Sequence, residues 1–134
     1  MQDRFKFRTY IPDLNFFKYW GWIEDNHYVG LCACGDYQMP ELLEKHTNQC
    51  TGLKDKNGTL IYEGDIVQFY DDGILKTMKI VWDDDELDFK AIGLKKSVEC
   101  YELDFSYLGC IEKEDNLEVI GNIYENSELL KEES

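Results

Sequence analysis

The chain has 134 residues, 43% of them hydrophobic, which is enough for one domain whose core needs neither a disulfide nor a metal. Its 28 acidic and 14 basic side chains give a formal net charge of -14, which would repel nucleic acids and anionic membranes. We therefore expect no direct binding to nucleic acid and no association with a membrane. The acidity is concentrated in residues 99–134, where Lys113 and Lys131 are the only basic side chains.

The start of the chain predicts no targeting signal. Residues 1–10, MQDRFKFRTY, alternate charged with aromatic side chains and lack the apolar segment of a signal peptide. No stretch approaches the ~18 apolar residues that a membrane-spanning helix needs. We therefore expect a cytoplasmic protein, in which the five cysteines remain reduced.

The first part of the chain predicts three strands and one helix. RFKFRTYI (4–11) alternates between basic and aromatic side chains, as a strand does. The aromatic run NFFKYWGWI (15–23) and HYVGLCACG (27–35), which a turn separates, are typical of a strand meander. MPELLEKHTNQC (39–50) favours a helix, because Pro40 suits a first helical position and two leucines follow closely.

The middle of the chain predicts short strands joined by tight turns. Asn57-Gly58 favours a type I′ hairpin turn, in which both central residues have positive φ. The sequence Glu-Gly-Asp at 63–65 predicts a second turn. It leads into IVQFY (66–70), whose β-branched and aromatic side chains favour a strand.

Two further strands are predicted after the turn at Asp71-Asp72-Gly73. They are ILKTMKIVW (74–82) and LDFKAI (87–92). Strict alternation in the second predicts that Leu87, Phe89 and Ala91 face inward.

The last third predicts less regular structure. ECYELDFSYLGCI (99–111) is interpreted as a loop followed by a strand, NLEVIGNIYEN (116–126) as a strand bent at Gly121, and Ser127 as the start of a helical turn. Short strands joined by short turns favour a curled antiparallel sheet. The sequence therefore predicts a single, mainly β domain over residues 1–134, a small, partly open, antiparallel β-barrel-like domain with one or two short helices.

Three segments carry a resemblance to a known family. TGLKDKNGTLIYEGDIV (51–67) and LEVIGNIYENSELL (117–130) resemble the two signature blocks of the YopX-type proteins of Gram-positive phages and prophages. FKFRTY (5–10) is similar to the opening strand of that family, which usually carries Trp near the place of Tyr10. The resemblance implies a mainly β, barrel-like fold, which we expect over residues 51–134, and a phage or prophage origin. The cytoplasm expected above would then be that of a bacterial host. It implies no catalytic residues, because the family has no established biochemical activity.

Residues 11–50 depart from the family pattern, and their aromatic and cysteine residues are particular to this chain. This segment and its boundary contain a weak candidate zinc set, Cys32, Cys34, His46 and Cys50, because thiolates and imidazole are zinc ligands. The first two are separated by one residue rather than the usual two. Independent packing of the four side chains is the favoured interpretation, with no metal and no cofactor.

Catalytic constellations are not apparent. A cysteine nucleophile would need His27 or His46 as its base, and neither histidine lies in a recognisable motif. The paired carboxylates at 71–72 and 83–85 coincide with predicted turns, where Asp forms local hydrogen bonds. We therefore expect a protein that is not an enzyme.

Two segments are candidates for binding a partner. The first is the predicted loop formed by Lys54, Asp55, Lys56 and Asn57, because binding residues often lie on loops held by a rigid sheet. The second is the aromatic run with Phe17, Tyr19, Trp20 and Trp22, which alternation would divide between two faces. A solvated turn and ordinary core packing are the respective alternatives.

These observations favour a phage or prophage accessory protein that binds another protein, of host or phage origin, or associates with itself. The alternative hypothesis is an inhibitor whose acidic C-terminal third imitates nucleic acid and occupies a basic groove on a DNA- or RNA-handling protein.

Overall fold

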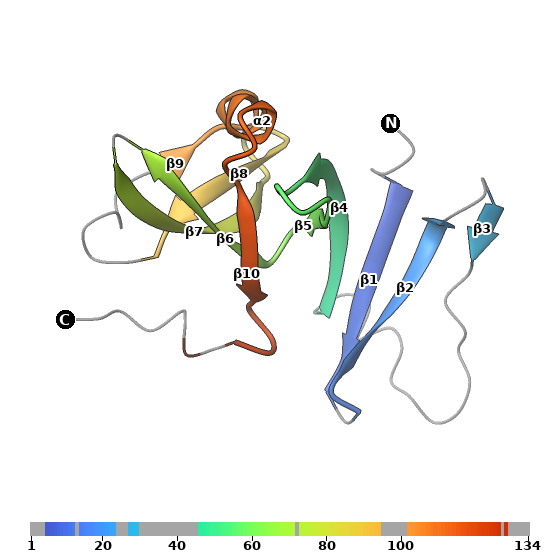
Figure 1. Ribbon diagram of the computed structural model, residues 1–134. Helices are drawn as coiled ribbons and strands as arrows, with labels where there is room; N and C mark the ends of the chain where they lie inside the picture. The colour runs from blue at the N-terminus through green and yellow to red at the C-terminus, as the bar shows by residue number, and fades with distance from the viewer. Residues whose placement is uncertain are drawn as a thin grey trace. The chain divides into compact units, whose positions relative to one another are not determined.

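The computed structural model describes residues 5–12, 14–23, 27–29, 46–71, 73–94, 102–126 and 128. The chain divides into two compact units, Met1–Gly52 and Leu53–Ser134. The described residues form two five-stranded antiparallel sheets and one helix (Figure 1). The predicted fold class, mainly β and partly open, is confirmed.

The first unit is a sheet of antiparallel strands. Its strands are β1 (Lys6–Ile11), β2 (Phe16–Ile23), β3 (His27–Val29) and the first part of β4 (Thr47–Lys54). They lie in the order β3-β2-β1-β4. The predicted meander is confirmed where it is described, since β2 pairs with β3 from Gly21–Val29 to Ile23–His27.

The helix predicted for 39–50 is wrong at its end, because Thr47, Asn48 and Gln49 pair with β1. The leucines that suggested the helix lie outside the described residues, as do residues 39–45 as a whole. Backbone pairing with β1 therefore decides the conformation of residues 47–49, which are all polar and provide no apolar helical face.

The second unit is a sheet covered by a helix. Its elements are β5 (Leu60–Tyr62), β6 (Asp65–Asp71), β7 (Ile74–Asp83), β8 (Asp88–Gly93), β9 (Glu102–Leu103), α2 (Phe105–Lys113) and β10 (Glu118–Asn122). Within the sheet the order is β10-β6-β7-β8-β9. The predicted bend at Gly121 is confirmed by a shift in register between Val119 and Gly121.

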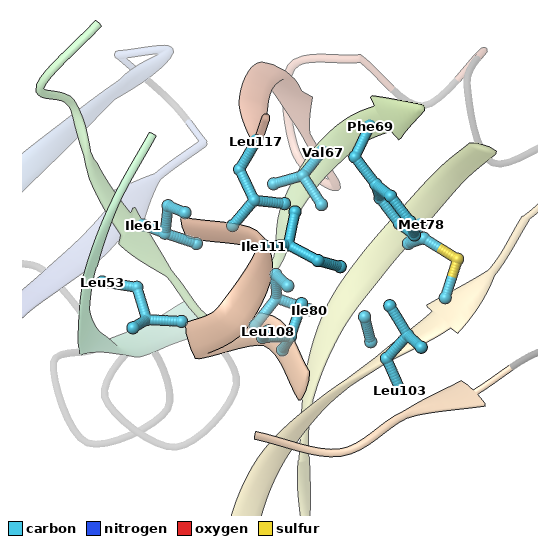
Figure 2. Close-up of a cluster of buried hydrophobic side chains, with 11 residues drawn as sticks. Leu53, Ile61, Val67, Phe69, Met78, Ile80, Leu103, Leu108, Ile111 and Leu117 are labelled. Atoms are coloured by element: carbon cyan, nitrogen blue, oxygen red, sulfur yellow. The ribbon is translucent and has the colours of Figure 1, made fainter. Parts of the chain in front are cut away.

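One hydrophobic cluster holds this unit together, and alternate residues of its strands point into it. Val67 and Phe69 of β6 are joined there by Met78 and Ile80 of β7, all at most 2% exposed. Figure 2 shows these side chains with Leu108 and Ile111 of α2 and with Leu103 and Leu117. Burial of this order contributes ~1.5–3 kcal/mol for each large apolar side chain.

The prediction of a loop and a strand over 99–111 is wrong, because residues 105–111 belong to α2. Asp104 caps the helix, and its side chain accepts a hydrogen bond from the backbone N–H of Tyr107. Leu108 and Ile111, three residues apart, place one face of the helix in the core. The aromatic residues in this segment had suggested a strand.

Among the described residues, no helix has the length and apolar character to cross a membrane.

Two local predictions are also corrected. Among Asn57 and Gly58, only the glycine has positive φ, at 84°, and its N–H donates to the Asp55 carbonyl over 3.0 Å. This is the pattern of a type I turn followed by a left-handed glycine, not of type I′. Leu87 does not face inward: it lies in the β7–β8 turn with φ of 55° and is 72% exposed. Phe89 and Ala91 are buried as predicted.

Candidate protein-binding surface

The loop between β4 and β5 is built around the carboxylate of Asp55. This side chain is only 7% exposed. Its Oδ1 accepts hydrogen bonds of 2.9 Å from the backbone N–H groups of Asn57 and Thr59. Its Oδ2 accepts a bond of 3.0 Å from the N–H of Val119 in β10. Asp55 therefore organises the loop, and its carboxylate is directed into the protein rather than toward a partner.

The same loop covers the outer edge of β10. The backbone N–H of Lys56 donates to the Leu117 carbonyl over 2.7 Å, beside the bond from Val119 to Asp55. The N–H of Lys54 donates to the Glu112 carboxylate of α2 over 2.8 Å. These bonds satisfy backbone groups that an open strand edge would otherwise expose.

The other predicted loop residues, Lys54, Lys56 and Asn57, are exposed. The ammonium of Lys56 lies 3.5 Å from the Glu118 carboxylate, with about half of each side chain open to solvent. The structure thus holds the loop backbone rigidly and leaves three of its four predicted binding residues on the surface.

An apolar pair that the sequence analysis did not identify lies at the end of the β6–β7 hairpin. Tyr70 of β6 stands directly opposite Leu75 of β7. Their side chains are 60% and 44% exposed, on the face of the sheet opposite to the core residues Phe69 and Met78. Adjacent Ile74 is also exposed.

A surface pocket of about 170 Å³ joins this pair to the loop. Its lining residues are Lys56, Gln68, Phe69, Tyr70, Leu75, Asp115, Asn116 and Glu118. Asn116 fixes the backbone of Tyr70, since its amide oxygen accepts from the Tyr70 N–H over 3.2 Å and its amide nitrogen donates to the Tyr70 carbonyl over 2.8 Å. Asp115 precedes it in a left-handed conformation, with φ of 53°, just beyond the end of α2.

The predicted aromatic candidates are divided between the two faces of β2. Trp20 stacks on Phe7 with ring centroids 4.7 Å apart, and its Nε1 donates to the Thr9 hydroxyl over 3.0 Å. On the other face, the Arg8 guanidinium lies 4.3 Å from the centre of the Phe17 ring. These contacts are those of side chains that pack within the unit.

The other two aromatic candidates are Tyr19 and Trp22. Tyr19, opposite Arg8, is 48% exposed and is thus the most accessible of the described candidates in this strand. Trp22 stands opposite Tyr28 in the pairing of β2 with β3. Its side chain lies outside the described residues.

The sequence matches one protein family, and the fold resembles that of a solved structure. The model of the YopX family, described as YopX protein, matches residues 22–131. The chain belongs to the YopX family. Among solved structures, it is similar to protein EF1440 from Enterococcus faecalis, with 24% identity over 94% of this chain and 97% of that one and a TM-score of 0.54. This likeness shows the fold alone. No curated protein matches the chain.

The zinc candidates of this YopX-family chain are only partly described. Cys32 and Cys34 lie outside the described residues. Cys50 is fully buried in β4, and the His46 ring stacks on Tyr10 with centroids 6.3 Å apart. Among the residues that the structure describes, no three His, Cys, Asp or Glu side chains form a group that could hold a metal. The zinc set remains a hypothesis.

A second, more acidic pocket of about 240 Å³ surrounds Lys90. The Lys90 ammonium lies 2.7 Å from Asp83 and 2.8 Å from Glu102, which ties together β7, β8 and β9. The hydrogen bond from Lys90, followed by those from the Asp85 and Glu86 N–H groups, lowers the pKa of Asp83. The bonds to Asp83 and Glu102 raise the pKa of Lys90. This arrangement connects strands within the sheet, and Asp83 makes the local turn contacts that the sequence predicts.

Proposed function

We propose that this YopX-family chain is a phage or prophage accessory protein that works as a non-enzymatic protein-binding module in the cytoplasm of its bacterial host. The binding surface is formed by Tyr70, Leu75 and the exposed residues of loop 54–58. The observation that carries the proposal is the outward-facing Tyr70–Leu75 pair, with exposed fractions of 60% and 44%. Large apolar side chains grouped on a surface are typical of protein interfaces, and aromatic residues are enriched there.

The rigidity of the surface supports this function. Tyr70 is held at its backbone by Asn116, and the loop is held by the three hydrogen bonds to Asp55. A surface that is ordered before binding loses less conformational entropy when a partner docks. Among the residues that the structure describes, the lining of this pocket contains no His, Cys or Ser side chain that could form a pair of nucleophile and base.

The alternative, imitation of nucleic acid, requires carboxylates that are available to a basic groove. Several described carboxylates of the acidic third have partners within the protein instead. Asp104 caps α2, Glu112 accepts from Lys54, and Glu102 pairs with Lys90. Glu125 accepts from the side-chain amide of Asn122. This distribution favours protein binding through the apolar pair.

A pull-down from nuclease-treated lysate of a Gram-positive host, before and after prophage induction, tests the proposal. The bait is the tagged chain, compared with the double variant Tyr70→Ala/Leu75→Ala. A matched control, Tyr107→Ala/Leu87→Ala, removes the same two side-chain types from other exposed positions. We expect proteins captured by the wild type and the control to be absent with Tyr70→Ala/Leu75→Ala.

Capture of the same proteins by all three baits would remove the Tyr70–Leu75 surface from consideration. A fourth bait, Glu114→Gln/Glu128→Gln, removes two exposed carboxylates of the acidic C-terminal third. Loss of a DNA- or RNA-handling protein with this bait alone would instead establish mimicry of nucleic acid.

A further inference from the structure

We infer that the partner presents an arginine or lysine beside an apolar residue, and that this basic side chain enters the pocket between Tyr70 and the carboxylates of Asp115 and Glu118. The inference rests on the proposed function, because it specifies the chemistry of the partner that uses the same surface.

The size of the pocket suits one inserted side chain. Its volume of about 170 Å³ is below the ~300 Å³ at which small-molecule sites usually begin. Its lining combines the large side chains of Tyr70 and Leu75 with the polar side chains of Asp115, Asn116 and Glu118. A long basic side chain matches this combination, because its stem is apolar and its end is charged.

The charges around the pocket favour a cation. Asp115 is exposed, and among the described residues its carboxylate forms no hydrogen bond or ion pair. It lies at the C-terminal end of α2, where the helix dipole adds negative potential. Lys56 is the one cation in the pocket lining, and its 3.5 Å pair with Glu118 is exposed and therefore weak. An incoming guanidinium can share Glu118 with Lys56 and pair with Asp115.

Tyr70 adds a second attraction for the same group. Its side chain is 60% exposed, so its ring is accessible beside the carboxylates. Aromatic faces attract cations, and arginine is the usual partner. Leu75, directly opposite on β7, provides the apolar contact for the neighbouring residue of the partner.

The net charge argues against a second copy as the occupant. Two chains with a formal charge of -14 each would repel one another, and each would bring the same acidic pocket rim to the contact. A basic partner is attracted by the same field, which increases its association rate.

A titration of the full chain, labelled with ¹⁵N and followed by NMR, tests this inference. The probe is the blocked peptide Gly-Ser-Leu-Arg-Leu-Ser-Gly, and its control carries citrulline, which has nearly the same shape but no charge. We expect the arginine peptide to shift the amide signals of Tyr70, Leu75 and Asn116, and to bind at least about fivefold more tightly than the citrulline peptide. Asp115→Asn/Glu118→Gln should remove this preference, whereas Glu114→Gln/Glu86→Gln, at other exposed positions, should keep it.

Equal binding of the two peptides, binding of neither, or shifts confined to other residues would overturn the inference. So would a concentration-dependent dimer that Tyr70→Ala/Leu75→Ala abolishes, because the occupant would then be a second copy. The pull-down distinguishes a failure of this inference from a failure of the proposed function. A partner lost with Tyr70→Ala/Leu75→Ala but kept by Asp115→Asn/Glu118→Gln supports the proposed function and contradicts the basic side chain, while a partner kept by both variants contradicts both.

Discussion

The carboxylate of Asp55 accepts a hydrogen bond from the backbone N–H of Val119, 64 residues further along the chain. Asp55 belongs to the first sequence block that resembles the YopX family, and Val119 belongs to the second. The two blocks therefore meet at one buried carboxylate, which closes a loop and covers a strand edge at once. This contact gives the resemblance a physical basis in the second unit.

Replacing Asp55 with alanine should lower the free energy of unfolding by about 3 kcal/mol, because three backbone N–H groups lose a charged acceptor in a buried position. Urea unfolding followed by circular dichroism measures this change. Lys56→Ala serves as the control. Among the described residues, the exposed side chain of Lys56 makes only the weak pair with Glu118, so its removal should cost below ~0.5 kcal/mol. Equal costs for the two variants would contradict the role of Asp55.

The strands of the second unit could be predicted because their signals are local. Phe89 and Ala91 alternate with Asp88 and Lys90 after a predicted turn, and the bend at Gly121 is marked by the glycine itself. Helix α2 could not be predicted from the sequence, because its aromatic residues also suit a strand. The decision in favour of a helix comes from Asp104 as its cap and from burial of Leu108 in the core, which depends on distant strands.

Asn116 should control the order of Tyr70 at the candidate surface. Asn116→Ala removes the acceptor for the Tyr70 N–H, so we expect the exchange of that amide with solvent to accelerate about fivefold to tenfold, which corresponds to ~1 kcal/mol. Gln68→Ala is a suitable control, because Gln68 bonds only to the Thr77 side chain among the contacts described for it. An unchanged exchange rate at Tyr70 in Asn116→Ala would show that other contacts hold this strand.

The candidate surface could be predicted only in part. The loop at 54–58 was marked by Asn57-Gly58, but the burial of Asp55 depends on Val119, far away in sequence. Tyr70 was missed because alternation tells which side chains share a face, not whether another element covers that face. Its exposure follows from tertiary structure alone.

Two identical substitutions should have opposite effects. Gly121→Ala would place a Cβ 2.6 Å from Cγ and Oδ1 of Asn126, whose side chain accepts from the Asn122 N–H, so we expect a loss of about 1–3 kcal/mol. Gly109→Ala in α2 meets no atom within 4 Å, so it should stabilise the protein by ~0.5–1 kcal/mol through helix propensity. Thermal unfolding of the two variants measures both changes in stability. A Gly121→Ala variant more stable than the wild type would mean that the Asn126 side chain moves away without cost.

The ion pairs of Lys90 predict a particular dependence of stability on pH. Hydrogen bonding to Lys90 lowers the pKa of Asp83 below its ordinary value of 3.8, so this stabilisation is complete above that pH and is lost as the pH falls through the lowered pKa. The pKa of Lys90 is raised above its ordinary value of 10.5, so the same stabilisation is complete below pH 10.5 and is lost only in stronger alkali. Between these limits the contribution of the pair is constant.

Lys90→Met should therefore unfold at a lower urea concentration than the wild type, by a margin that is constant between about pH 5 and pH 9 and narrows below pH 3.8. The narrowing follows because protonated Asp83 no longer carries the negative charge that pairs with Lys90. Comparing the two proteins at each pH removes the general effect of reducing the acidic net charge. Lys79→Met, on the neighbouring strand, provides the control and should show no such narrowing. A margin for Lys90→Met that stays the same down to about pH 2 would assign the role of Lys90 to packing of its stem rather than to its charge.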